Sequence, residues 1–201
     1  MMWISSLGGS ASVRVTGVKE TGIRGHWSPD GEWIVYVRQD GVEQFVEKTK
    51  SSGQQAPIRI ARSMLGCSPL WSPAGDWIAI TNPDLVLVSP DARSKEKLRD
   101  AFDSTTSAYG WSRDGKVLYA AYPENRRLVL DAIQVEAGVA RRIADYGDVS
   151  IGQNGGHNIL SVSPDGKSLA TSLRQFRADI WMIEGLELPG SWWSRLWPRS
   201  R

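Results

Sequence analysis

The apolar residues of this chain occur in short runs that are separated by turn-forming residues. The longest runs hold apolar side chains at consecutive positions, as in residues 33–37, and each follows a cluster rich in Ser, Pro, Asp and Gly. Because side chains alternate between the two faces of a strand, consecutive apolar residues predict strands that are buried on both faces. Corresponding runs occur at 77–80, 117–120 and 169–171.

Each buried run is followed by segments that predict two further strands. Residues 58–61 alternate apolar with polar or small side chains, which is typical of an outer strand that meets water. A short first strand precedes each turn, so the pattern predicts units of four strands. Third strands are expected at 45–46, 85–88, 128–130 and 180–183, and fourth strands at 58–61 and 142–144, with a weaker signal at 97–98.

A repeated turn motif organises these strands. The segments HWSPDGEWIVYV, LWSPAGDWIAIT, GWSRDGKVLYAA and SVSPDGKSLATS align on Ser28, Ser72, Ser112 and Ser163. These serines are 44, 40 and 51 residues apart. A period near 45 residues is the length that a four-stranded propeller blade requires. The repeat therefore predicts an all-β propeller.

The Ser-Pro-Asp-Gly motif has the chemistry of a tight turn. Proline fixes the first central φ angle, Asp favours the next position, and Gly supplies the positive φ that follows. The Ser hydroxyl is expected to cap a backbone amide across the turn. Two copies depart from the pattern, with Ala74 in place of Asp and Arg113 in place of Pro. The Asp occurs in three of the four aligned turns and is replaced by Ala in the other. This pattern favours a structural role for the Asp over a catalytic or metal-binding one.

The W-S-P-D-G repeat, together with DIWMIEG at 179–185, resembles the TolB-type, WD-repeat-like β-propeller repeat family. This resemblance implies a propeller of six to eight blades that serves as a binding or scaffolding surface in a bacterial regulatory or envelope protein. It also implies an alternative, because such propellers occur as accessory domains of prolyl oligopeptidase-like hydrolases. The Gly-His and Trp-Asp hallmarks of true WD repeats are not met.

The repeat divides the chain into one propeller domain and a tail. The expected domain covers 1–186, with a partial blade at 1–17 and blades at about 22–62, 66–100, 106–146 and 155–186. The C-terminal tail covers 187–201. Two strands at the start and three at the end do not combine into one closing blade of four. We therefore expect an open arc, which is either the C-terminal portion of a larger propeller or associates with itself through its open ends.

Charge argues against nucleic-acid binding. The formal net charge is +2, and residues 187–201 hold three Arg and one Glu, which leaves 21 basic and 21 acidic residues in 1–186. A nucleic-acid-binding domain normally presents a basic face or stripe. The expected partner is therefore a protein or peptide, with no nucleic acid.

Cysteine usage and the N-terminal sequence say little about the compartment. The single cysteine, Cys67, excludes an internal disulfide and is expected to be a packed residue. The first residues lack the features of a secretory signal, and no apolar run reaches the length of a transmembrane helix. A complete chain would then be cytoplasmic, whereas a fragment of a longer protein is compatible with the periplasm.

No catalytic, metal-binding or cofactor-binding motif occurs in the sequence. There is no Gly-x-Ser-x-Gly nucleophile elbow, no Gly-rich phosphate loop and no Cys or His pair at zinc spacing. We therefore expect a non-enzymatic chain without a cofactor. His26 is expected to be a strand residue. His157 lies in the Gly-rich segment GQNGGHNIL, which is either an inter-blade loop or part of a partner-binding surface.

The tail, LPGSWWSRLWPRSR, combines tryptophan with arginine. The candidate partner-binding residues here are Trp192, Trp193, Arg195 and Trp197, and we add His157 to them. Aromatic and Arg side chains together suit a partner groove or a membrane interface. The alternative is that the tryptophans pack on the open end of the last blade, in place of its missing fourth strand.

Overall fold

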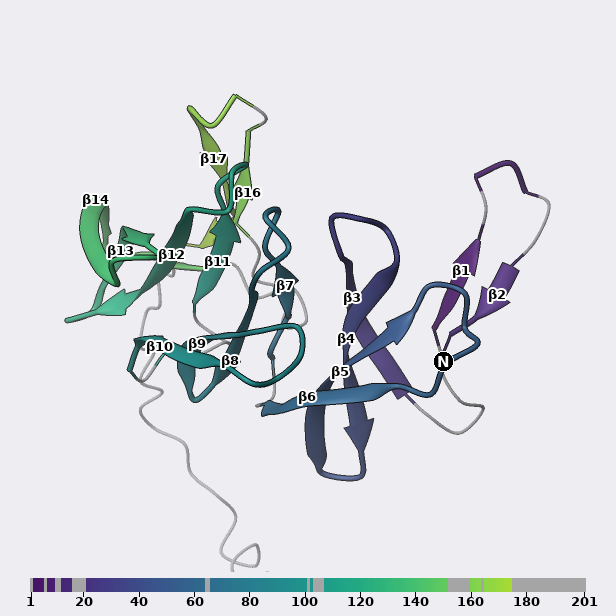
Figure 1. Cartoon of the computed structure of the whole chain (residues 1–201). Coiled ribbons are helices and arrows are strands. Elements are labelled where there is room, and N and C mark those ends of the chain that lie inside the picture. Colours follow the sequence, from purple (N-terminus) through teal and green to yellow (C-terminus); the bar gives the residue numbers. More distant parts are fainter. Residues whose placement is uncertain are drawn as a thin grey trace, which may run out of the picture.

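The fold consists of antiparallel β-sheets arranged one after another in an arc (Figure 1). A computed structural model describes residues 2–5, 7–9, 12–15, 21–63, 66–100, 102, 107–151, 160–163 and 165–174. Among these residues the regular elements are all strands. Within the same ranges, no helix is long and apolar enough to cross a membrane.

Three sheets are complete four-stranded meanders, here called blades 1, 2 and 3. In each of them consecutive strands pair side by side. Blade 1 contains β3 (Thr21–Trp27), β4 (Trp33–Asp40), β5 (Glu43–Lys50) and β6 (Ile58–Ser63). Blade 2 contains β7 (Leu70–Trp71), β8 (Ile78–Asn82), β9 (Asp84–Val88) and β10 (Lys95–Arg99). Blade 3 contains β11 (Ala108–Trp111), β12 (Val117–Glu124), β13 (Arg127–Gln134) and β14 (Val139–Gly147).

Smaller strand pairs lie beside the complete blades. The N-terminal pair is β1 (Trp3–Ser5) with β2 (Ser12–Arg14). The fourth repeat contains β15 (Ser150–Ile151) paired with β18 (Leu173–Arg174), and β16 (Ser161–Val162) paired with β17 (Leu169–Ala170). The N-terminal pair and the fourth repeat occupy opposite ends of the arc in Figure 1. The predicted all-β propeller in the form of an open arc is therefore confirmed.

The second strands are buried on both faces, as their consecutive apolar residues predict. In blade 3, Leu118 and Ala120 belong to a buried cluster that contains Leu85 and Leu87 of blade 2. The intervening strand position, Tyr119, packs instead against a cluster with residues of the fourth repeat. The second strands of blades 2 and 3 thus contribute alternate side chains to two inter-blade cores, and these cores hold the arc together.

The outer strands are largely exposed. β14 has no buried residue along its length, and β6 has one, Ile60. The weakly predicted fourth strand of blade 2 forms as β10, which pairs with β9. Basic side chains on these outer strands protect the sheet edges from pairing with another chain.

The Ser-Pro-Asp-Gly turn is closed by its own side chains. Ser28 Oγ accepts a hydrogen bond from the Trp33 N–H at 2.9 Å and donates one to Asp30 Oδ1 at 2.5 Å. Asp30 Oδ1 also accepts the Glu32 N–H at 2.9 Å. The copies at Ser112 and Ser163 form the same three bonds. The predicted capping of a backbone amide by the serine is therefore confirmed.

A fifth copy of this turn joins β9 to β10, where the periodic alignment does not place one. Ser89 Oγ donates to Asp91 Oδ1 at 2.6 Å and accepts the Ser94 N–H at 2.9 Å. The position that is Gly in the other copies is Ala92, with φ of 61°. The motif therefore encodes a turn geometry that serves hairpins at two places in the blade.

Candidate functional site: grooves between the blades

Adjacent repeat turns are stacked on one face of the arc. We call this face, which carries the turns at Ser28, Ser72, Ser112 and Ser163, the turn face. A Cβ on Gly115 would lie 2.9 Å from Ala74 Cβ, and one on Gly75 would lie 3.4 Å from Pro29 Cγ. Each of these glycines thus lies against the turn of the preceding blade. This close approach gives a steric reason for the small residue at Ala74.

A groove opens on the turn face between blades 2 and 3. It has a volume of about 470 Å³ and holds four carboxylates, one lysine and the partly buried ring of Trp77. We call it the acidic groove, and its charged residues are Asp76, Glu96, Asp114, Lys116 and Glu136. Blade 2 contributes the first two of these side chains and blade 3 the other three, so neighbouring blades form the groove jointly.

The carboxylates of the acidic groove differ in their bonding. Asp114 Oδ1 accepts the Ser112 hydroxyl at 2.7 Å and the Lys116 N–H at 3.1 Å. The serine bond is the largest cause that lowers the pKa of Asp114. The carboxylates of Asp76, Glu96 and Glu136 form no hydrogen bond or ion pair within the described part of the chain, and these three residues are exposed. Among the described residues, no group of three or more His, Cys, Asp or Glu is placed to hold a metal ion.

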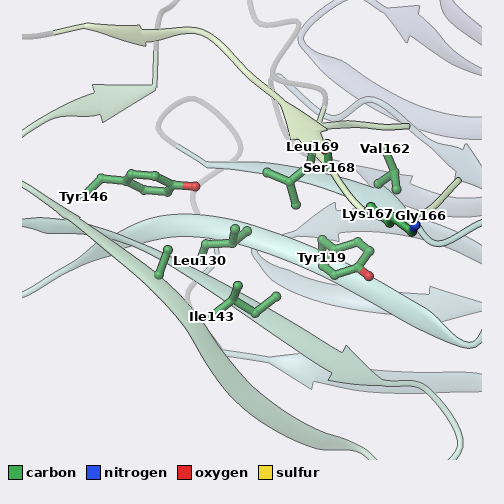
Figure 2. Close-up of a pocket in the computed structure, with 10 residues that line it drawn as sticks. Tyr119, Leu130, Ile143, Tyr146, Val162, Gly166, Lys167, Ser168 and Leu169 are labelled. Carbon is green, nitrogen blue, oxygen red and sulfur yellow. The ribbon is translucent and has the colours of Figure 1, made fainter. Parts of the chain in front are cut away.

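A second groove lies between blade 3 and the fourth repeat. Figure 2 shows Tyr119, Leu130, Ile143 and Tyr146 on one side and the β16–β17 hairpin on the other. Its volume is about 430 Å³. We call it the apolar groove. The hairpin residues that line it are Val162, Gly166, Lys167, Ser168 and Leu169.

Side chains on the first strands of blades 1 and 3 donate hydrogen bonds to the backbone at the start of blade 2. The Tyr109 hydroxyl donates to the Ser68 carbonyl oxygen at 2.6 Å, and Trp111 Nε1 donates to the Leu70 carbonyl oxygen at 3.2 Å. Arg24 donates to the Cys67 carbonyl oxygen at 3.0 Å. These bonds satisfy carbonyl groups where backbones from two blades approach each other.

Cys67 and His26 have structural positions. Cys67 is fully buried, and burial raises the pKa of its thiol, so the reactive thiolate is disfavoured. His26 lies on β3, as expected, and its Nδ1 accepts the Trp71 N–H of blade 2 at 3.3 Å. Desolvation lowers the pKa of His26, which favours the neutral ring that this bond needs.

The partner-binding residues predicted from the sequence lie outside the described residues. They are His157, Trp192, Trp193, Arg195 and Trp197. The residues of both grooves were not predicted. For the acidic groove the one signal in the sequence is Ala74, the departure from the repeat where Gly115 approaches.

The fold is that of a TolB-like β-propeller. The structure is similar to TolB from Acinetobacter baumannii, with a TM-score of 0.62 and 18% identity over 84% of this chain and 42% of that chain. It is also similar to an oligogalacturonate lyase in complex with manganese (TM-score 0.56, 11% identity, 78% and 54%). A third similar structure is an acylaminoacyl peptidase (TM-score 0.52, 9% identity, 74% and 28%).

These similarities establish the fold alone. The chain spans less than half of the TolB structure that it matches. The matched proteins include TolB as well as a lyase and a peptidase, so a propeller module is common to proteins with different activities. No protein-family model matches the sequence, and the search of curated proteins gives no match.

Proposed function

We propose that this chain is a non-enzymatic β-propeller module that binds a protein or peptide partner, and that the acidic groove contacts a basic segment of that partner. The observation that carries the proposal is that one open groove holds the ring of Trp77 and three carboxylates that have no partner among the described residues. The wider context, a bacterial regulatory or envelope protein, rests on the resemblance of the repeat and on the likeness to TolB.

The groove has the chemistry that recognises a lysine or arginine side chain. The ring of Trp77 offers a face for the aliphatic stem or the cation itself, and the carboxylates accept hydrogen bonds from the charged end. With four carboxylates against Lys116, the groove carries an excess of negative charge that attracts a basic segment and repels an acidic one.

Binding of short immobilised peptides of defined charge to the purified chain tests this proposal. We expect binding to Lys- and Arg-containing peptides that weakens as salt rises. The variant Asp76→Asn/Glu136→Gln should weaken it about tenfold or more, which corresponds to 1.4 kcal/mol or more. Asp148→Asn, an exposed carboxylate outside the groove, is the control and should bind as the parent chain does. Equal binding by both variants, or preference for acidic peptides, contradicts the proposal.

The non-enzymatic part of the proposal has its own test. The purified chain is incubated with panels of peptide and ester substrates, and product formation is followed over time. We expect no turnover above that of a heat-denatured sample. Reproducible turnover that is lost in a groove variant would overturn this part and leave the binding assay as a separate question.

A second candidate function is an accessory propeller in a hydrolase. It is favoured by the likeness to the acylaminoacyl peptidase structure, of which this chain covers 28%. The coding sequence on either side of this chain discriminates the two functions. An adjoining α/β-hydrolase domain favours the accessory role, whereas an adjoining kinase, winged-helix or membrane segment favours the regulatory or envelope role.

Self-association through the ends of the arc is a further part of the proposed binding role. The N-terminal strand pair exposes Trp3, a residue that is 56% exposed. An exposed tryptophan on a terminal strand pair is suited to contact with another sheet. Light scattering across a concentration series measures it, and a monomer at every concentration contradicts it. Membrane contact through the tail stays a prediction.

A further inference from the structure

Trp33 and Trp77 occupy the same place in adjacent blades. Each stands five residues after the serine of its repeat turn. Trp33 packs against the buried cluster that blades 1 and 2 share, whereas Trp77 packs against the cluster that blades 2 and 3 share. The two rings therefore mark equivalent positions on the turn face, one blade apart. Trp77 lies in the acidic groove, but the charged side chains around Trp33 are of the opposite sign.

Two lysines cover the ring of Trp33. Lys50 pairs with Trp33 across β4 and β5, and Lys48 lies two positions away on the same face of the sheet. The Lys48 and Lys50 ammonium groups are 4.3 Å and 4.5 Å from the ring centroid. Within the described ranges the Lys48 ammonium forms no hydrogen bond or ion pair. Desolvation is the largest cause that lowers the pKa of Lys48, so an anion that reached this ammonium would stabilise its charged form.

The outer strand β10 places opposite charges on its two faces. Lys95 pairs directly with Val88, which belongs to the buried cluster against which Trp33 packs. Directly opposite side chains share one face of a sheet, and successive side chains alternate between faces. Lys95 therefore lies on the blade 1 side of blade 2, and Glu96 lies on the blade 3 side, where it lines the acidic groove. Lys95 is exposed and has no ion pair with the described residues.

These cations form a positive site beside the acidic groove. We call it the lysine site, and it consists of Trp33, Lys48, Lys50 and Lys95. Two carboxylates oppose the cations, and both have partners of their own. Glu32 is paired with Lys50 at 2.6 Å, and Asp91, which attracts Lys48, accepts the Ser89 hydroxyl at 2.6 Å. Three ammonium groups against two carboxylates leave an excess of positive charge, whereas the acidic groove has an excess of negative charge.

The separation of the two sites fits a short stretch of peptide. Sheets that pack face to face are about 10 Å apart, and an extended chain advances about 3.3 Å per residue. Equivalent positions in adjacent blades therefore correspond to about three residues of an extended peptide. A segment that carries only basic residues would place a cation against the lysine site and be repelled there, so the pair of sites discriminates between charge patterns.

We propose that the turn face binds an extended peptide segment in which an acidic and a basic side chain are about three positions apart. The acidic side chain lies at the lysine site, where Lys48 and Lys95 donate to its carboxylate, and the basic side chain lies in the acidic groove. This inference rests on the function proposed for the acidic groove, and it adds the second charge of the ligand and the spacing of the two charges.

Immobilised peptides test the second charge. A peptide with Arg and Glu three positions apart, in either order, is compared with the same peptide in which Gln replaces Glu. We expect the purified full chain to bind the Glu peptide about three- to fivefold more tightly in at least one order. This ratio of affinities should fall to about one in Lys48→Gln and in Lys95→Gln. The matched control is Lys167→Gln, an exposed lysine of the fourth repeat, which should keep the ratio. A ratio of one in the parent chain, or its loss in the control, overturns the proposal.

A series of spacings tests the geometry. With Glu placed one, three or six positions from Arg, the gain in affinity should be greatest at three. Equal gains at every spacing would mean general attraction between charges and would overturn the proposal. Lys95→Gln keeps the test valid if Lys48→Gln folds poorly, because Lys95 is exposed on an outer strand.

The Gln peptide separates this inference from the function on which it rests. Failure of the Gln peptide and the Glu peptide to bind contradicts the role of the acidic groove and this inference together. Binding of the Gln peptide with no gain from Glu contradicts this inference alone.

Discussion

Gly115 lies so close to the preceding repeat turn that an added Cβ would be 2.6 Å from Ser72 Oγ and 2.9 Å from Ala74 Cβ. The φ angle of Gly115 is also positive, at 72°. One position thus meets two demands, a left-handed backbone within its own turn and a close contact with the neighbouring blade. This contact brings the two sides of the acidic groove together.

Gly115→Ala should destabilise the chain more than Gly31→Ala, although both glycines occupy the same place in the repeat. Gly31 has φ of 73° with nothing within 4 Å of an added Cβ, so its substitution costs about 1–2 kcal/mol of backbone strain. Gly115→Ala adds about 1–3 kcal/mol of overpacking against blade 2. Urea denaturation of the two variants measures the difference, and equal midpoints would contradict the stacking of the turns.

Ala92→Gly should stabilise the chain. Ala92 holds a left-handed backbone with φ of 61°, in a turn whose other copies have Gly there. Relief of that strain, offset by the greater freedom of glycine in the unfolded chain, leaves a gain of about 0.5–1 kcal/mol. Gly31→Ala is the reverse change in another copy and should have the opposite sign. Thermal unfolding of both variants tests the pair, and loss of stability in Ala92→Gly rules out the strain.

Tyr109→Phe should weaken the contact between blades 2 and 3. The change leaves the Ser68 carbonyl without the hydroxyl that donates to it, at a cost of about 1–3 kcal/mol for an unsatisfied buried group. Tyr119→Phe is the matched control and should change stability little, because the Tyr119 hydroxyl forms no hydrogen bond with the described residues. Chemical denaturation compares the two, and equal effects would mean that the bond contributes nothing.

The stability of the turns should depend on acid pH. The bond from the Ser112 hydroxyl is the main cause that lowers the pKa of Asp114, and the same holds for Asp30, Asp91 and Asp165 with their own serines. A lowered folded-state pKa contributes stability above the unfolded value, about 3.9, and this contribution is lost as the pH falls through the folded value. Stability should therefore decrease below about pH 4.

NMR titration of the Asp114 carboxyl gives the site-specific test of this pH dependence. Ser112→Ala removes the donor, so the pKa of Asp114 should rise toward that of an ordinary aspartate. The pKa of Asp165 serves as the internal control and should not change, because its donor is Ser163. An Asp114 pKa that stays low in Ser112→Ala would assign the shift to the backbone bond from Lys116 instead.

Much of the fold was predictable because the interactions that form its turns and strands involve residues that are close in the sequence. The bonds of each turn close within five residues of its serine, so the motif predicts the turn wherever it occurs. The copy at Ser89 was missed because it carries Ala92 and lies outside the period. The partner-binding residues proposed from the sequence, His157 and the tail, stay predictions, since they lie outside the described residues.

The sequence by itself determined the all-β class, the four-stranded repeat and the chemistry of its turns, because period, turn residues and apolar runs act over a few neighbouring positions. Only the tertiary structure decided which residues of different blades meet. Asp76 and Glu136 are 60 residues apart in the chain but line one groove. Ile60 and Ile143 lie at the same register shift in the outer strands of blades 1 and 3, but Ile60 is 8% exposed and Ile143 is 44% exposed. Such relationships depend on the packing of one blade against the next, which no local pattern specifies.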